Sequence, residues 1–252
     1  MTEKKYIKNV SEFIDYVDTL YMLYCDKYVN SELLFRGQTA VFPLIPKIGR
    51  LPFRKIADGK IKTEKLILEE FKRGILPLSE FQPTNNWDLL ALAQHHGLPT
   101  RLLDWSTSAL IGLWFAVGLA PIIDAKNKHH DGIVWVFAPT LNDYRTDTVS
   151  ADPLNNNVTK VFKSSIISKR ISAQSGVFTC HKILENDNIV GFEKHRSYKK
   201  KLIRIYIKSS DFAAIRKQLN MLGINNASVF PDIDGFCKHL EWKYSKLKDE
   251  NF

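Results

Sequence analysis

The sequence lacks the short motifs that mark several common classes of enzyme. It contains no GxxxxGK[ST] phosphate loop, no GxGxxG turn after a strand, no HExxH metal motif and no GxSxG nucleophile elbow. These absences speak against a kinase, a P-loop NTPase, a dehydrogenase and an α/β-hydrolase. Any chemistry must come from polar residues that are scattered along the chain.

Cysteine is also scarce. The three cysteines, Cys25, Cys180 and Cys237, are far apart and form no CxxC pair. We therefore expect neither a zinc cluster nor a disulfide framework, and a reducing, cytoplasmic setting fits best. Cys180 precedes His181, but neighbouring residues of a strand point to opposite faces, which argues against a Cys–His nucleophile there.

Long apolar segments are nearly absent. The first ten residues, MTEKKYIKNV, are charged and have no apolar stretch, so we expect no secretory signal peptide. The longest uncharged run lies between Asp104 and Asp124, but it starts with Trp-Ser-Thr-Ser and Pro121 interrupts its end. What remains is too short to span a membrane comfortably, so a buried helix is the better interpretation.

The 252 residues include 36 Lys and Arg against 27 Asp and Glu, giving a net charge of +9. With 44% hydrophobic and 25% charged residues, the composition is that of a globular protein with a sizeable core. A basic balance favours acidic partners such as nucleic acid, nucleotides or phosphates. The alternative is that a lysine-rich proteome simply produces basic surfaces.

Helical and strand-like periodicities alternate along the chain, with helices first and strands clustered later. This order predicts the α+β class: a mixed, largely antiparallel sheet packed with helices. We expect one domain over residues 1–252, with a helical N-terminal extension (1–30) and a core (31–252). Helices are expected at 10–24 (capped by Ser11), 63–75, 88–96, about 106–119, 211–222 and near the end, and strands at 32–38, 132–139, 176–184 and 202–209.

The expected strand at 32–38 ends in Phe-Arg-Gly-Gln. Arg36 is costly to half-bury unless its guanidinium meets an anion or a carboxylate. Gly37 allows a ligand or another backbone to approach closely. The structural alternative is an ion pair between Arg36 and a carboxylate such as Asp104, which would hold two elements together.

A second polar cluster precedes the apolar helix. His95 and His96 end one helix, and Arg101, Asp104 and the hydroxyl residues 106–108 follow. A helix start offers unpaired N–H groups to a phosphate, and an arginine nearby adds a bidentate anion donor. The alternative is structural: Asp104 or Ser106 caps the helix, and Arg101 pairs with Asp104.

Two further clusters are weaker. Gln174 lies four residues after Arg170 and just before a strand, where an amide either fixes a ribose hydroxyl or caps a turn. The segment EKHRSYKKKLIR, residues 193–204, is rich in Lys and Arg. It suits an edge that faces nucleic acid, and a solvated loop and strand explains it equally well.

Four segments together resemble the FRG domain, which is named for its Phe-Arg-Gly. The similarity runs from about Leu33 to Leu240 and implies a bacterial protein of a defence or toxin-like context, with protein partners in such a system. The function of the family is obscure. The segments are LLFRGQ, ALAQHHGLPTRLLDWSTSALIGLWFA, RISAQSGVF and LGINNASVFPDIDGFCKHL.

The same residues resemble, more distantly, the arginine class of ADP-ribosyltransferases. The resemblance implies an ADP-ribosyltransferase-like core in which Arg36 contacts the phosphates of NAD. Ser106, Thr107 and Ser108 would shape the nicotinamide pocket, and Gln174 would match the first position of the family's Gln/Glu-x-Glu. Gly176 stands where that family has its catalytic glutamate, and a glycine supplies no negative charge.

If the chemistry is present, another carboxylate must replace the missing glutamate, and Asp104, Glu185 and Glu193 are the candidates. The resemblance implies a transferase or NAD glycohydrolase with NAD as its substrate. His95 or His96 would move the proton. DNA or RNA would be an acceptor or ligand.

Two other hypotheses remain open. The first is a module without catalysis that binds nucleic acid, a nucleotide or a partner protein. The second is a metal-dependent nuclease that uses Asp104 with His95 or His96, although the sequence offers no second carboxylate nearby. We expect no bound metal and no membrane association.

Overall fold

The computed structural model describes residues 4–24, 32–54, 59–78, 83–146, 152–165 and 169–250. These residues form the predicted α+β fold around a seven-stranded mixed sheet of order β1-β7-β4-β2-β3-β6-β5. β1 and β7 are parallel, and every other neighbouring pair is antiparallel. The strands are β1 (Lys5–Ile7), β2 (Leu34–Gln38), β3 (Leu102–Ser106), β4 (Gly132–Phe137), β5 (Lys160–Phe162), β6 (Gly176–Cys180) and β7 (Leu202–Ile207).

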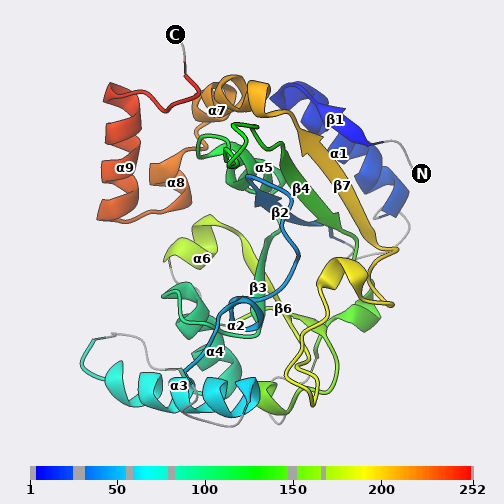
Figure 1. Ribbon diagram of the computed structural model, residues 1–252, viewed down its shortest axis with the longest axis vertical. Helices are drawn as coiled ribbons and strands as arrows, with labels where there is room; N and C mark the ends of the chain where they lie inside the picture. The colour runs from blue at the N-terminus through cyan, green and yellow to red at the C-terminus, as the bar shows by residue number, and fades with distance from the viewer. Residues whose placement is uncertain are drawn as a thin grey trace.

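Helices cover one face of this sheet in two groups, as Figure 1 shows. Short 3-10 helices interrupt several loops, at Leu141–Asp143, Pro153–Asn155, Phe192–Lys194 and Ser209–Asp211. The α-helices are α1 (Val10–Tyr24), α2 (Lys47–Arg50), α3 (Lys60–Gly74), α4 (Asn86–His95), α5 (Ala109–Val117), α6 (Lys169–Ala173), α7 (Phe212–Met221), α8 (Asn226–Val229) and α9 (Ile233–Tyr244).

The sheet consists of two halves that meet at one point. β2 pairs with β4 over its whole length, and β3 does the same with β6. In contrast, β2 and β3 are in register only at Phe35 and Ser106. We call β1, β7, β4 and β2 the β2 half, and β3, β6 and β5 the β3 half. Beyond Phe35 the two halves diverge, which opens a gap in the sheet.

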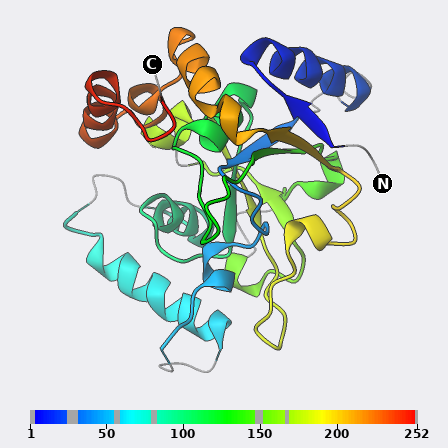
Figure 2. The same cartoon turned by 45° about the horizontal axis from the view of Figure 1, so that its top comes forward.

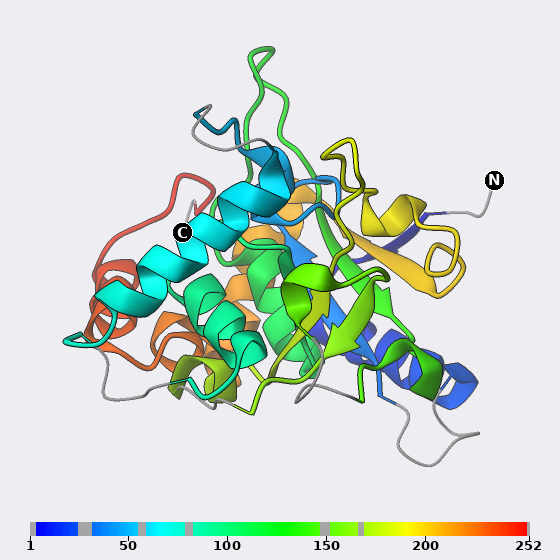
Figure 3. The same ribbon diagram turned by 90° about the horizontal axis from the view of Figure 1, so that it is seen from below.

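Strand alternation produces three apolar clusters. On one face, α1, α5 and α7 pack on the β2 half, while α3 and α4 pack on the β3 half, so two separate clusters lie side by side. Seen from below, α3 crosses in front of α4 (Figure 3). On the other face, residues such as Trp105 and Trp135 form a third cluster beneath loops. The divide between the first two clusters lies over the gap between the halves.

The N-terminal segment is part of the core. β1 adds a parallel strand beside β7, and Val10, Phe13 and Leu20 of α1 are buried in the first cluster. The predicted helix at 10–24 is confirmed, although residues 1–30 are not purely helical. The prediction that Ser11 caps this helix is wrong, because the side chain of Asn9 accepts the hydrogen bond from the N–H of Glu12.

The expected strands at 32–38, 132–139, 176–184 and 202–209 are all present within a few residues, as β2, β4, β6 and β7. The sequence analysis missed β3, because Leu102–Ser106 follows a turn and was assigned to the approach to a helix. Strands and helices therefore interleave, and the expected order of helices first and strands later is wrong. α8 and α9 lie beside α7, on the opposite side from α1 (Figure 2).

α5 begins at Ala109, with Ser108 at its N-cap position. It packs on β2 without intervening side chains, because a Cβ at Gly37 would lie 2.0 Å from the carbonyl oxygen of Gly112. Gly37 is therefore required for the approach of a second backbone, and it also lines the cleft described below. This contact fixes the height of α5 above the strand that carries Arg36.

Candidate functional site

Six predicted site residues, Gly37 among them, converge on one cleft. It has a volume of about 630 Å³ and opens at the gap between the two halves of the sheet. Arg36, Asp104 and Ser106 line it from the strands that flank the gap, His95 lines it from the end of α4, and Gln174 lines it from the turn before β6. Residues separated by up to 138 positions (174 − 36) thus share one surface.

Arg36 bridges the gap. Its Nη1 donates a hydrogen bond of 2.7 Å to the backbone carbonyl of Asp104 and lies 3.7 Å from that residue's Oδ2. The guanidinium takes the place of the missing strand pairing. Its Nε is buried and has no hydrogen-bond partner among the described residues. Burial lowers the pKa of Arg36 and Asp104 opposes this shift, and an arginine remains charged at neutral pH.

Asp104 is the exposed end of a hydrogen-bond chain. Buried Thr100 donates from Oγ1 to Oε1 of Gln94 at 2.6 Å, and Nε2 of Gln94 donates to Oδ2 of Asp104 at 2.9 Å. The backbone N–H of Leu102 donates to the same threonine hydroxyl. The Asp104 side chain is 54% exposed, and its Oδ1 makes no hydrogen bond to any described residue. One oxygen is thus held while the other is free of hydrogen bonds to described residues, and the residue lines the cleft.

The hydroxyl element has mainly a structural role. Oγ of Ser106 donates to the carbonyl of Gln174 at 2.7 Å and accepts from the N–H of Ser108 at 2.9 Å. The N–H of Thr107 donates to the carbonyl of Ser175. These bonds join the turn before α5 to the turn before β6. Of the three residues only Ser106 lines the cleft, so the expectation that Thr107 and Ser108 form its wall is not met.

Arg101 does not lie at the cleft, which corrects its assignment as an anion donor. Its side chain is 1% exposed and pairs with Glu64 of α3, which is 0% exposed, with 2.6 Å between Nη2 and Oε2. Nη1 donates to the carbonyls of Pro153 and Leu154. The expected pairing of Arg101 with Asp104 is therefore also wrong. This arginine locks α3 against β3.

His95 lies at the edge of the cleft, at the end of α4. Burial lowers its pKa, and the neighbouring His96 and Arg170 lower it further, while Asp104 and Asp232 oppose them. A neutral histidine at the edge of the cleft can accept a proton at physiological pH. His96 lies beside it, with 4.9 Å between the ring centroids.

Among the acids proposed from the sequence, only Asp104 lines the cleft. Glu193 instead accepts a hydrogen bond from the N–H of Leu44, and Glu185 lies in a turn beyond β6. The structure adds two acids that the sequence analysis missed, Asp232 and Asp234, both at the start of α9. Their signal in the sequence was that of a helix cap, since Oδ1 of Asp232 accepts from the N–H of Gly235.

Gly176 lies at the cleft and has little room for a side chain. A Cβ there would lie 3.2 Å from Cγ2 of Ile171. Ser106 is directly opposite Gly176 on β3, and Asp104 is two residues further along the same strand, on the same face of the sheet. A carboxylate therefore reaches this part of the cleft from the neighbouring strand rather than from β6.

Cysteine and metal chemistry receive no support from the described residues. Cys180 is buried, and burial raises the pKa of its thiol to about 12. The side chain of His181 is bonded to Thr179. Within the described ranges no group of three or more His, Cys, Asp or Glu side chains is arranged to hold a metal ion.

The basic segment 193–204 lies away from the cleft. Tyr198 packs into the third apolar cluster, Lys201 pairs with Asp143, and Arg204 stacks on Trp135 with 4.9 Å to the ring centroid. Lys199 and Lys200 are exposed. Part of this segment therefore has a structural role.

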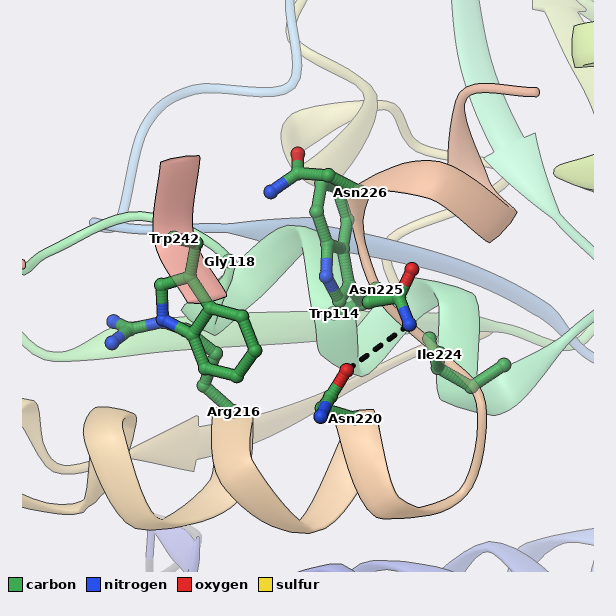
Figure 4. Close-up of a pocket in the computed structure, with 8 residues that line it drawn as sticks. All are labelled: Trp114, Gly118, Arg216, Asn220, Ile224, Asn225, Asn226 and Trp242. Carbon is green, nitrogen blue, oxygen red and sulfur yellow. Dashed lines mark hydrogen bonds between the residues drawn. The ribbon is translucent and has the colours of Figure 1, made fainter. Parts of the chain in front are cut away.

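A second, much smaller cavity lies between α5, α7, α8 and α9 (Figure 4). Its volume of about 10 Å³ suits a single water molecule. Asn220 and Asn225 close one side through a hydrogen bond of 3.1 Å. Arg216 lies at the other side and pairs with Asp249 and Glu250, which anchors the C-terminal segment. We interpret this cavity as a packing feature.

Part of the chain matches a known protein family. Residues 31–121 match the FRG domain. The match confirms the resemblance and covers β2 to α5, with Arg36, His95, Asp104 and the hydroxyl element. Gln174 and the α8–α9 region lie outside it. Searches of curated proteins and of solved structures found no match. No helix in the described ranges is long and apolar enough to cross a membrane.

Proposed function

We propose that the cleft lined by Arg36 and Asp104 binds NAD. The protein would break the bond between nicotinamide and ribose, as an ADP-ribosyltransferase or an NAD glycohydrolase. The observation that carries the proposal is the convergence of Arg36, Asp104, Ser106 and Gln174 on one cleft. Arg36, Ser106 and Gln174 were selected through the resemblance to ADP-ribosyltransferases, and Asp104 was one of three carboxylates expected to replace the missing glutamate. We also propose that this activity serves bacterial defence or a toxin-like role.

The cleft has the size and chemistry for such a substrate. Its volume of about 630 Å³ lies within the range of about 300–1,000 Å³ typical of small-molecule sites. Phe35, Phe115 and Phe178 supply apolar surface for flat rings, and charged groups of both signs lie among them.

In the proposed reaction, the bond between C1′ of the ribose and the nicotinamide nitrogen breaks, and its electron pair leaves with nicotinamide. C1′ becomes a cationic, oxocarbenium-like centre, which a carboxylate stabilises by its negative charge. Asp104 is suited to this task because Gln94 and Arg36 hold it in place while Oδ1 is free of hydrogen bonds to described residues. It would replace the glutamate that is absent at Gly176.

The nucleophile is water in the hydrolase and a hydroxyl or amine of an acceptor in the transferase. It forms the new bond to C1′ and must lose a proton. His95 is the candidate acceptor, because its lowered pKa keeps the imidazole neutral. With water, the products are ADP-ribose, nicotinamide and a proton, so the reaction balances. For the transferase, the net charge of +9 favours DNA or RNA as the acceptor.

The test is nicotinamide release from NAD, measured with and without added DNA or RNA. We expect release by the wild type and a large loss in Arg36→Ala and Asp104→Asn. The exposed change Asp18→Asn on α1 is the matched control and should leave the rate unaltered. A wild-type protein that releases no nicotinamide under any of these conditions would refute the proposal.

The competing candidate is a binding module without catalysis, and one observation favours it. Ser106 is engaged in hydrogen bonds within the protein, as is the side-chain amide of Gln174, which donates from Nε2 to the carbonyl of Val229. If the chain binds DNA or RNA with steep salt dependence but releases no nicotinamide, the binding module is the better description.

A further inference from the structure

Arg170 is a second arginine at the cleft. It projects from the short helix α6 and lines the cleft together with His95 and Asp232. The sequence analysis noted it only as a neighbour of Gln174. Arg36 is held by the carbonyl and the carboxylate of Asp104, whereas the guanidinium of Arg170 makes no hydrogen bond or ion pair with a described residue.

The side chain of Arg170 rests on an aromatic ring. The guanidinium carbon lies 4.3 Å from the ring centroid of Phe230. Phe230 in turn meets Trp114 and Phe115 edge to face, with centroid distances of 5.6 and 6.2 Å, so the ring is anchored to α5. Stacking occupies the face of the planar guanidinium and leaves the N–H groups at its edge available to donate.

The helix that carries Arg170 is also fixed. Nε2 of Gln174 donates a hydrogen bond of 3.2 Å to the carbonyl of Val229, which directly precedes Phe230. α6 and the aromatic platform therefore belong to one unit. A side chain held in this way loses little conformational entropy when it binds a ligand.

Asp232 and Asp234 line the same cleft as Arg170, but neither forms an ion pair with it. The guanidinium of Arg170 makes no hydrogen bond and no ion pair with the described residues. Asp232 shares the cleft but caps α9 through the N–H of Gly235 at 2.7 Å. A positive, planar, bidentate donor thus faces a cleft of ligand size.

We infer that Arg170, held on Phe230, binds the diphosphate of a nucleotide in this cleft. The inference rests on the proposed function and assigns a different role to each of the two arginines. Arg36 holds the end of β3 with Asp104, where the bond would break, and Arg170 receives the phosphates. This reverses the expectation from the family resemblance that Arg36 contacts the phosphates.

The test measures binding, so it does not depend on turnover. Affinities for ADP and for adenosine are determined by calorimetry for the wild type and four variants: Arg170→Ala, Arg170→Lys, Phe230→Leu and Lys169→Ala. Lys169→Ala is the matched control, because it removes the same charge from the adjacent exposed residue, which does not line the cleft. Thermal unfolding of each variant checks the fold.

We expect Arg170→Ala to weaken ADP binding about tenfold or more, since charge-assisted bonds to phosphate are lost, and to leave adenosine binding unchanged. Arg170→Lys should recover part of the loss, Phe230→Leu should weaken ADP binding severalfold, and Lys169→Ala should behave as the wild type. The inference is overturned if the wild type binds ADP no better than adenosine, or if Arg170→Ala binds ADP as tightly as Lys169→Ala does.

This outcome is separable from that of the proposed function. Loss of ADP affinity in Arg170→Ala without any nicotinamide release by the wild type would support the diphosphate site and refute NAD cleavage. Nicotinamide release by the wild type, together with unchanged ADP affinity in Arg170→Ala, would support NAD cleavage and refute the diphosphate site.

Discussion

Two arginine–carboxylate pairs flank the same strand and have opposite characters. Arg101 and Glu64 are both buried and in close contact: Nε and Nη1 of the arginine donate hydrogen bonds, and Nη2 lies 2.6 Å from Oε2 of Glu64. Arg36 and Asp104 are partly open to solvent, lie 3.7 Å apart and leave Oδ1 of the aspartate free of hydrogen bonds to described residues. The first pair is closed and the second is open.

The difference separates structural from functional charge. A closed pair has offset its desolvation cost with internal bonds and can offer nothing to a ligand. An open pair is held by neighbours on one side only, which keeps charge available at a surface. The closed pair locks α3 to the β3 half, and the open pair lies at the gap between the halves.

The largest expected effect is on the closed pair. Glu64→Gln leaves the buried charge of Arg101 without a counter-charge, so we expect the free energy of unfolding to fall by about 3–5 kcal/mol. Urea denaturation measures it. Glu69→Gln, an exposed change on the same helix, should alter stability by less than about 0.5 kcal/mol. Equal losses in both variants would show that the closed pair has no special role.

For the open pair, Arg36 and Asp104, we expect a large effect on activity and a small effect on stability. Asp104→Asn removes the charge but keeps the shape, and we expect nicotinamide release to fall about 10²–10³-fold through lost stabilisation of the cationic centre. Stability should change by less than about 1 kcal/mol, because the side chain is exposed. A variant that unfolds readily but retains its activity would contradict the contrast between the two pairs.

Much of the fold could be predicted from the sequence. The strand at 202–207 and the helix at 10–24 were found from apolar periodicity, and the strands at 34–38 and 132–137 from short apolar runs. β3 was missed because Leu102–Ser106 is short and lies directly between a turn and a helix cap. Without β3 the sheet has no gap, and the position of the cleft could not be derived.

The site was predicted in part. Arg36, Ser106 and Gln174 were predicted to lie together from the family pattern, and the structure brings them to one cleft with Asp104, one of three candidate carboxylates. Arg101 was assigned to the wrong carboxylate, since sequence distance favoured Asp104 whereas Glu64 arrives from another helix. Whether Arg36 or Arg101 forms the buried ion pair depends on long-range packing, and the local sequence does not contain that information.

The buried region around Arg101 also includes a histidine, His181, whose protonation is disfavoured in the folded protein. His181 donates its backbone N–H to the carbonyl of Arg101, and burial lowers the pKa of its imidazole to about 3. Below the unfolded pKa of about 6.5, the unfolded chain takes up a proton that the native state refuses, so acid favours unfolding. We expect this group to cost about 2 kcal/mol of stability between pH 7 and pH 5.

Urea unfolding at pH 7, 6 and 5 measures this loss, and His181→Gln isolates the contribution of the imidazole. The variant should be less stable at pH 7, because a buried bond to Thr179 is altered, but its stability should fall less steeply with acid. His96→Gln, an exposed change, should keep the slope of the wild type. Parallel curves for the wild type and His181→Gln would refute the assignment.

The smallest effect tests how the open pair is held. Thr100→Val keeps the size of the side chain but removes the hydroxyl that fixes Gln94, which in turn donates to Asp104. Because the carboxylate then samples other orientations, we expect the kcat of nicotinamide release to fall severalfold, up to about tenfold, with little change in KM. Thr100→Ser retains the hydroxyl and should restore most of the rate, whereas a purely structural role predicts equal losses in stability and no rescue of kcat by serine. Rescue by Thr100→Ser would therefore show that the buried threonine acts through Asp104, and that the open pair depends on the closed interior beneath it.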